Sequence, residues 1–221
     1  MRIALLGGTG DIGEGLALRF AFHTDHEVVI GSRDPDRARN KANEYETELA
    51  SRGRDVTVNG FVNAMAADRA DVVVLSVPPY YAADTVEAVA DRIDDAILVS
   101  PAVGMRRDEA GLHYDPPPAG SVHEHVAEVV PDGVPLVGAF HNLSADRLAN
   151  LDVDLDLDTL VLGDDPDARQ TVRMLAEGIE GLRALDAGPA ANAPEVESLT
   201  PLLVTIAMHN DGMHDVGVTF H

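Results

Sequence analysis

The sequence of 221 residues contains no cysteine and only one lysine, Lys41. Because cysteine is absent, the chain has no disulfide, thiol nucleophile or thiolate metal site. Its 16 Lys and Arg residues stand against 38 Asp and Glu, which leaves a formal net charge of −22. So negative a chain excludes an electropositive surface for nucleic acid or anionic lipid. No apolar run has the length of a membrane span and no charged-then-apolar leader is recognisable, so we expect a soluble cytoplasmic protein.

The acidic residues are scattered between apolar residues along the whole chain rather than gathered in one tail. Such a self-repelling chain folds stably where salt screens its charges, since the Debye length falls to about 3 Å at 1 M salt. Together with the near-absence of lysine, this pattern indicates a halophilic, archaeal source. The alternative, an ordinary acidic protein, does not explain why nearly every lysine is missing.

Short apolar segments alternate with longer segments of helical periodicity. Strands are expected at residues 2–7, 27–31, 56–58, 71–77, 96–100, 136–140, 160–162 and 182–185. Helices are expected at residues 13–22, 34–51, 63–69, 81–93, 121–130, 144–151, 166–178 and 195–209. The segment 104–120, rich in Pro and Arg, is expected to be a loop.

Fully apolar strands that alternate with helices require a parallel sheet covered on both faces. We therefore expect an α/β fold with a doubly wound parallel sheet, Rossmann-like, over residues 1–145. Residues 146–221 are expected to form a smaller C-terminal α/β domain.

A glycine-rich motif, G-x-G-x-x-G, lies directly after the first expected strand and before the first helix. Gly8 permits the tight turn, Gly10 lets the backbone approach a pyrophosphate, and Gly13 lets helix and strand pack closely. The helix N-terminus offers free N–H groups and a positive dipole end to phosphates. The motif in this context predicts a dinucleotide site.

The end of the second strand distinguishes NADP from NAD. An NAD site places an acidic residue there for the ribose 2′-hydroxyl, whereas this chain has Ser32 and Arg33, with Arg37 one helical turn later. A hydroxyl and two guanidiniums suit a 2′-phosphate, so we expect NADP. Asp34 and Asp36 are expected to point to solvent.

Two possible metal sites are not supported by their spacing. The alternating aspartates of 152–158 lack the glycine and the bidentate glutamate of a calcium loop. His123 and His125 diverge on a helix and have no third ligand close in sequence. We expect no metal site.

Five segments together resemble one family, the F420-dependent NADP oxidoreductases. They are the N-terminal MRIALLGGTG, Gly31-Ser32-Arg33, Val99-Ser100-Pro101, Leu185-Asp186-Ala187-Gly188-Pro189 and Glu197-Ser198-Leu199-Thr200-Pro201-Leu202. The resemblance covers nearly the whole chain. Departures from the family pattern are Pro79-Tyr80-Tyr81, Asn142 and a longer segment at 210–213.

The resemblance implies two cofactor sites, one for NADP and one for coenzyme F420. For the NADP phosphates it implies Thr9, Gly10, Asp11 and Ile12, with Ser32, Arg33 and Arg37 at the 2′-phosphate and Pro79 and Ala83 beside the nicotinamide. For the deazaflavin it implies Val103, His141, Leu143, Ala145, Ser198, Thr200 and Val216.

The activity that the resemblance implies is reversible hydride transfer between nicotinamide C4 and deazaflavin C5. The cofactors carry this chemistry, so no side-chain acid or base is obligatory. His141 would stabilise negative charge on the reduced deazaflavin, through a hydrogen bond or as a cation. By their chemistry, Arg106 and Arg107 are candidates for the anionic tail of F420. We expect a homodimer that associates through the C-terminal helix.

Two other functions remain open from the sequence. One is an NADPH-dependent reductase of a small keto acid or imine, although such enzymes commonly use a lysine and Lys41 lies on a polar helix. The other is a non-catalytic NADP sensor, which would bind the nucleotide without turnover.

Overall fold

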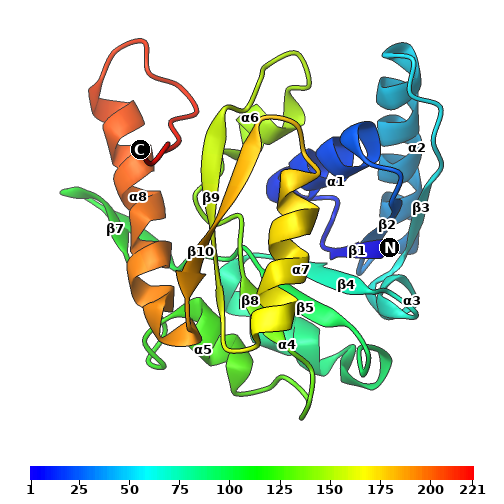
Figure 1. The fold of residues 1–221 in the computed structure, drawn as a ribbon, viewed down its shortest axis with the longest axis horizontal. Coiled ribbons are helices and arrows are strands. Elements are labelled where there is room, and N and C mark those ends of the chain that lie inside the picture. The colour runs from blue at the N-terminus through cyan, green and yellow to red at the C-terminus, as the bar shows by residue number, and fades with distance from the viewer.

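An eight-stranded sheet forms the centre of the molecule in the computed structural model, which describes residues 1–221 (Figure 1). Its strand order is β10-β9-β8-β5-β4-β1-β2-β3, and every neighbouring pair is parallel except β8 and β9. The strands are β1 (Arg2–Leu6), β2 (Glu27–Ser32), β3 (Val58–Val62), β4 (Val72–Leu75), β5 (Ile97–Ser100), β8 (Leu136–Gly138), β9 (Leu157–Gly163) and β10 (Leu182–Gly188).

Helices cover both faces of this sheet. They are α1 (Asp11–His23), α2 (Pro35–Ser51), α3 (Asn63–Ala67), α4 (Ala82–Glu87), α5 (Val122–Ala127), α6 (Ala145–Ala149), α7 (Pro166–Glu177) and α8 (Ala193–His209). Short 3-10 turns are η1 (Pro79–Tyr81), η2 (Ala90–Arg92) and η3 (Ala190–Asn192). None of these helices has the length and apolar character needed to cross a bilayer.

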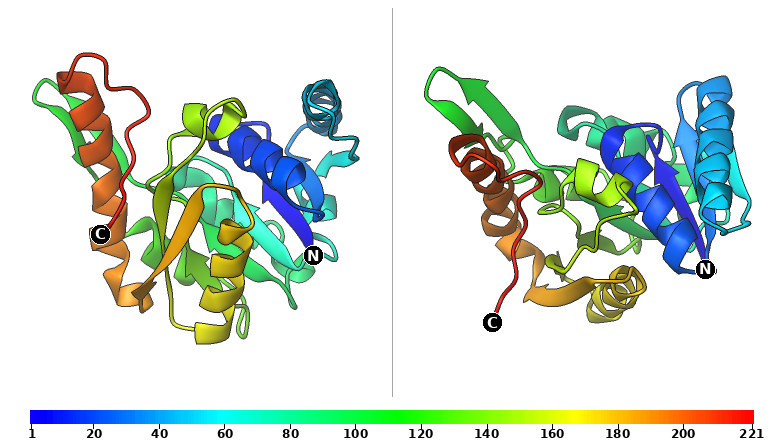
Figure 2. Two further views of the ribbon diagram at one scale, coloured as in Figure 1. Left: turned by 45° about the horizontal axis from the view of Figure 1, so that its top comes forward. Right: turned by 90° about the horizontal axis from the view of Figure 1, so that it is seen from above.

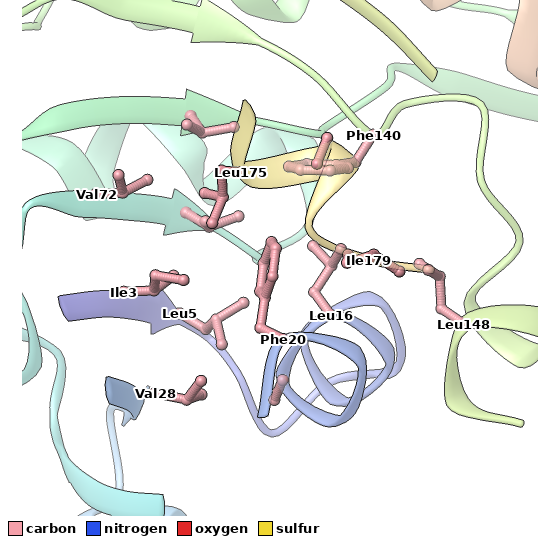
Figure 3. Close-up of a cluster of buried hydrophobic side chains, with 14 of the residues drawn as sticks. Ile3, Leu5, Leu16, Phe20, Val28, Val72, Phe140, Leu148, Leu175 and Ile179 are labelled. Atoms are coloured by element: carbon pink, nitrogen blue, oxygen red, sulfur yellow. The ribbon is translucent and has the colours of Figure 1, made fainter. Parts of the chain in front are cut away.

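Alternation along the strands divides the core into two layers. In β1, Ile3 and Leu5 point to the side covered by α1, α2, α6 and α7, whereas Ala4 and Leu6 point to the side of α3, α4 and α5. Figure 3 shows part of the first layer, where Phe20 of α1 lies against β1. Burial on both faces explains why β1, β2, β4 and β5 are almost entirely apolar, and the helices on both faces of the mostly parallel sheet confirm the predicted doubly wound α/β fold.

A β-hairpin occupies the segment predicted to be a loop. Its strands, β6 (Met105–Asp108) and β7 (Gly111–Tyr114), pair antiparallel as a separate two-stranded sheet. The prediction for 104–120 was therefore wrong for these residues. All of β6 is exposed and β7 is only half-buried, so the hairpin lacks the apolar alternation by which strands are recognised.

Other helix and strand boundaries differ from the predicted ones for local reasons. The helix predicted at 81–93 is broken into η1, α4 and η2. The third strand begins at Val58 and runs through Gly60, where an added Cβ would lie 2.4 Å from backbone atoms of Ala38 on α2. Close packing of α2 thus requires a glycine inside the strand. Because glycine has a low propensity for strands, the sequence did not predict a strand beyond Val58.

The sheet continues across the boundary predicted at residue 145, since β8 pairs with β9. A separate domain over 146–221 stays a prediction. In this C-terminal part, α8 stands beside the β6–β7 hairpin at one end of the molecule (Figure 2). The last residues return to the sheet, where the Asp158 amide donates to the Val218 carbonyl at 2.8 Å.

Candidate functional site

The glycine loop between β1 and α1 is folded tightly against the sheet. The Gly8 amide donates to the carbonyls of Leu5 and Gly31 at 3.0 and 3.1 Å. An added Cβ on Gly8 would lie 2.8 Å from the Leu5 oxygen, and one on Gly13 would lie 2.6 Å from the Gly8 Cα. Neither position therefore accepts a side chain without movement of the backbone.

Gly10 differs from the other two glycines of the motif. The nearest atom to an added Cβ there is the Gly7 oxygen at 3.4 Å, so the chain itself leaves room for a side chain. Gly10 is also the N-cap of α1, where no side chain accepts from the first-turn N–H groups. The geometry leaves those donors to a ligand, and Asp11 and Ile12 form the first positions of the same turn.

A cleft of about 600 Å³ opens beside this loop. Its walls come from the glycine loop, from the end of β2 with the start of α2, and from the segment after β4 (Figure 1). The sequence-predicted residues that line it are Thr9, Gly10, Ser32, Arg33 and Arg37. The structure thus brings two of the four predicted phosphate residues and all three predicted 2′-phosphate residues into one cavity, whereas Asp11 and Ile12 do not line it.

The two arginines of this cleft carry no carboxylate partner. The Arg37 guanidinium donates to the Thr9 carbonyl at 3.3 Å, and the Arg33 guanidinium lies over the Tyr81 ring. The Asp34 carboxylate instead caps α2 by accepting from the amides of Asp36 and Arg37 at 2.9 and 3.2 Å.

Asp36 is also engaged within α2, where it pairs with Arg39. Both aspartates are exposed, as expected from the sequence, and their carboxylates are used for capping and pairing at the start of α2. Asp34 and Asp84 also line the cleft, but neither forms an ion pair with Arg33 or Arg37, so both guanidiniums can still donate to an anionic ligand.

A second pocket, of about 340 Å³, lies between the segment after β8, α8 and the C-terminal residues. Four residues predicted for the deazaflavin line it: Leu143, Ala145, Thr200 and Val216. The Thr200 hydroxyl donates to the His141 carbonyl at 2.8 Å and so joins α8 to the end of β8. Ser144 donates to Asp215 at 2.7 Å and fixes the C-terminal segment over the pocket.

Other residues predicted for the two cofactors lie outside these pocket walls. Val103 and Ala83 are buried, and the Ser198 hydroxyl turns back to the Glu195 carbonyl of its own helix at 2.8 Å. Pro79 begins η1, beside the Pro78 that lines the first cleft. Their contacts with cofactors stay predictions.

His141 is almost fully buried, and neither of its ring nitrogens has a hydrogen-bond partner. Burial, with a smaller contribution from nearby His123, lowers the pKa of His141 to about 3. The imidazole is therefore neutral, which argues against the cationic role considered from the sequence and leaves the hydrogen-bonding role. Unpartnered hydroxyls of Ser76 and Ser100 follow β4 and end β5, so orphaned polar atoms gather at the carboxyl ends of the strands.

Glu197 is a buried residue for which the sequence predicted no role. Its carboxylate accepts from the amides of Val122 and His123 at 3.0 and 2.9 Å, and from the Tyr114 hydroxyl at 2.9 Å. It therefore joins α8, α5 and the hairpin. Burial raises the pKa of Glu197. Glu195 and Glu197 stand on either side of the buried Val196, and the sequence alone does not distinguish the buried glutamate from the exposed one.

Arg106 and Arg107, the predicted tail-binding residues, lie on the exposed strand β6. Arg106 is paired with Asp108 at 2.5 Å and with Asp115 at 3.6 Å. Arg107 reaches the sulfur of Met208 on α8 at 3.2 Å. Of the two, Arg107 is the one without a carboxylate partner, and a role in binding the F420 tail stays a prediction for both.

Comparisons with known proteins identify the family of this chain. Residues 2–104 match the family model described as NADP oxidoreductase, coenzyme F420-dependent. An F420-dependent NADP reductase of Methanothermobacter thermautotrophicus is 39% identical over 213 residues, which are 95% of this chain and 90% of the relative. One of Methanocaldococcus jannaschii is 37% identical over 206 residues, 92% of this chain and 91% of the relative.

A solved structure shares the fold. A protein from Arthrobacter sp. FB24, described as a candidate F420-dependent NADP reductase, superposes with a TM-score of 0.76 at 24% identity and covers 93% of both chains. Since the two archaeal relatives are 37% and 39% identical over nearly the whole chain, this protein belongs to the family of coenzyme F420-dependent NADP oxidoreductases.

Proposed function

We propose that this protein catalyses reversible hydride transfer between NADP(H) and coenzyme F420. The observation that carries the proposal is the 39% identity to an F420-dependent NADP reductase along 95% of the chain. When both cofactors are bound, the nicotinamide C4 and the deazaflavin C5 exchange the hydride. The protein has to hold the two rings with their reacting carbons next to each other and to exclude water.

The first cleft has the chemistry of an NADP site. The glycine loop presents backbone N–H groups at the start of α1, and Ser32, Arg33 and Arg37 supply a hydroxyl and two unpaired guanidiniums. Guanidinium forks suit phosphate oxygens, and a neutral ribose hydroxyl would leave them unused. These residues would hold the pyrophosphate and the 2′-phosphate.

The second pocket has the chemistry of a site for a planar ring. Six of its eleven lining residues are hydrophobic, and Leu143, Leu203 and Val216 are among them. Apolar walls orient a flat ring and exclude water, and reactive carbons held about 3–3.5 Å apart react as if at very high concentration. His141 does not line this pocket, and a hydrogen bond from its neutral imidazole to the bound ring stays a prediction.

The proposal is tested by following the F420 absorbance band after the protein, NADPH and F420 are mixed in molar KCl. We expect the band to bleach with NADPH and to remain with NADH. A folded protein that binds NADPH but never bleaches F420 would refute the activity. Equal rates with NADH would retain the activity and refute the role of the arginines.

Two variants on α2 separate the arginine contribution from a general change of charge. Arg37→Met removes a guanidinium that lines the cleft, and we expect it to raise the KM for NADPH at least about tenfold, the loss of one charge-assisted phosphate contact. Arg39→Met removes the same charge from a residue paired with Asp36, and we expect parent kinetics. Equal effects of the two variants would show that only the overall charge matters.

The homodimer expected from the sequence is also part of this proposal. Leu202, Val204 and Met208 are exposed on α8, and residues 198–208 carry no charged side chain in an otherwise strongly acidic protein. We expect a dimer by light scattering in molar KCl and a monomer for Leu202→Asp. A monomeric parent protein would refute the association.

The cytoplasmic location expected from the sequence stays a prediction.

A further inference from the structure

Tyr81 and Arg33 face each other across the cleft of the proposed NADP site. Arg33 comes from the turn after β2 and Tyr81 from η1 after β4, and both line the cleft. The guanidinium carbon of Arg33 lies 5.4 Å from the centre of the Tyr81 ring. This separation is within the range of a cation–π interaction.

An aromatic partner leaves the donors of Arg33 free. A carboxylate would consume its N–H groups in hydrogen bonds, but the neighbouring Asp34 and Asp36 are engaged with the start of α2 and with Arg39. A ring face attracts the guanidinium through its plane, so the N–H edge can still donate to an anion. The cleft therefore contains a guanidinium that lies against an aromatic ring and has no carboxylate partner.

The backbone of Tyr81 is held in place by two hydrogen bonds. The Tyr81 amide donates to the Pro78 carbonyl at 2.9 Å, and the Tyr81 carbonyl accepts from the Thr85 hydroxyl at 2.7 Å. Tyr80 packs edge-on against it, with ring centres 4.8 Å apart. The turn that begins with two prolines thus fixes the backbone from which the Tyr81 ring extends toward Arg33.

We infer that Tyr81 is a positioning residue for Arg33 that sets the preference for NADP over NAD. By holding the guanidinium over the cleft, Tyr81 lowers the cost of ordering Arg33 when a 2′-phosphate arrives. A cofactor without that phosphate gains nothing from the arrangement. The inference deepens the proposed function and depends on it.

The test measures the dissociation constants of NADPH and NADH by nicotinamide fluorescence, in molar KCl and without F420. For Tyr81→Leu we expect NADPH to bind about two- to fivefold more weakly, the strength of an exposed cation–π pair, and NADH to bind as in the parent. Tyr81→Phe keeps an aromatic face and should bind NADPH within about twofold of the parent.

A double-mutant cycle distinguishes positioning from direct contact. If Tyr81 acts through Arg33, the Arg33→Met, Tyr81→Leu double variant binds NADPH no more weakly than Arg33→Met alone. Additive losses, or equal losses for NADPH and NADH in Tyr81→Leu, would show instead that Tyr81 contacts the nucleotide and would overturn the inference. A parent protein that binds no NADPH would refute the proposed function itself.

Discussion

Replacement of His141 should change how the protein responds to acid. Burial, and then the neighbouring His123, lower the pKa of His141 from 6.5 to about 3. The unfolded chain therefore takes up a proton as the pH falls below 6.5, while the folded protein does not. The contribution of His141 to stability is complete above pH 6.5 and is lost as the pH falls from there toward 3.

The size of the effect follows from these two values. At pH 5 the imidazole of an unfolded chain is protonated in a ratio of about 30 to 1, whereas that of the folded protein is almost entirely neutral. The difference lowers the free energy of unfolding by about 2 kcal/mol relative to pH 7. His141→Gln removes this titration, so the stability gap between parent and variant should shift by about 2 kcal/mol between the two pH values.

Urea unfolding in molar KCl, followed by circular dichroism at pH 7 and pH 5, measures that gap. His209→Gln is the matched control for the same substitution at an exposed imidazole, which lies at the end of α8. A gap that is the same at both pH values for His141→Gln would show that the imidazole is hydrated or protonated in the folded protein. The neutral role proposed for it would then be wrong.

Three further outcomes follow from the structure. Gly10→Ala should leave the melting temperature nearly unchanged but weaken the binding of NADPH at least about tenfold. Gly13→Ala, whose Cβ would lie 2.6 Å from the Gly8 Cα, should lower the free energy of unfolding by about 1–3 kcal/mol. Similar melting temperatures for the two variants would contradict this interpretation of the loop. Arg19→Met should lower the free energy of unfolding by at least about 2 kcal/mol, because the buried guanidinium donates to four backbone carbonyls between residues 147 and 153. A loss below about 0.5 kcal/mol in urea unfolding would show that water takes the place of the guanidinium at these carbonyls. Raising KCl from 0.1 to 1 M should raise the melting temperature, because the Debye length that screens the net charge of −22 falls from about 10 Å to about 3 Å. A melting temperature independent of salt would argue against the halophilic origin.

Local chemistry explains how much of the fold could be predicted from the sequence. The apolar run of β1, the glycines that follow it and the start of α1 lie within residues 2–13, so spacing alone predicts the turn and its free N–H groups. Ser32 ends β2 and Arg33 follows it, and because β2 is an apolar strand buried on both faces, the two residues are placed at the carboxyl edge of the sheet. Each of these inferences needs only neighbours in the chain.

Tertiary packing alone decided the remaining features. The β6–β7 hairpin has no apolar alternation and was predicted to be a loop. The contact between Arg33 and Tyr81 depends on β2 and β4 lying on either side of β1, which no local pattern encodes. The solvation of an imidazole is also decided by packing, so the sequence could propose His141 for the site but could not distinguish a neutral ring from a cation.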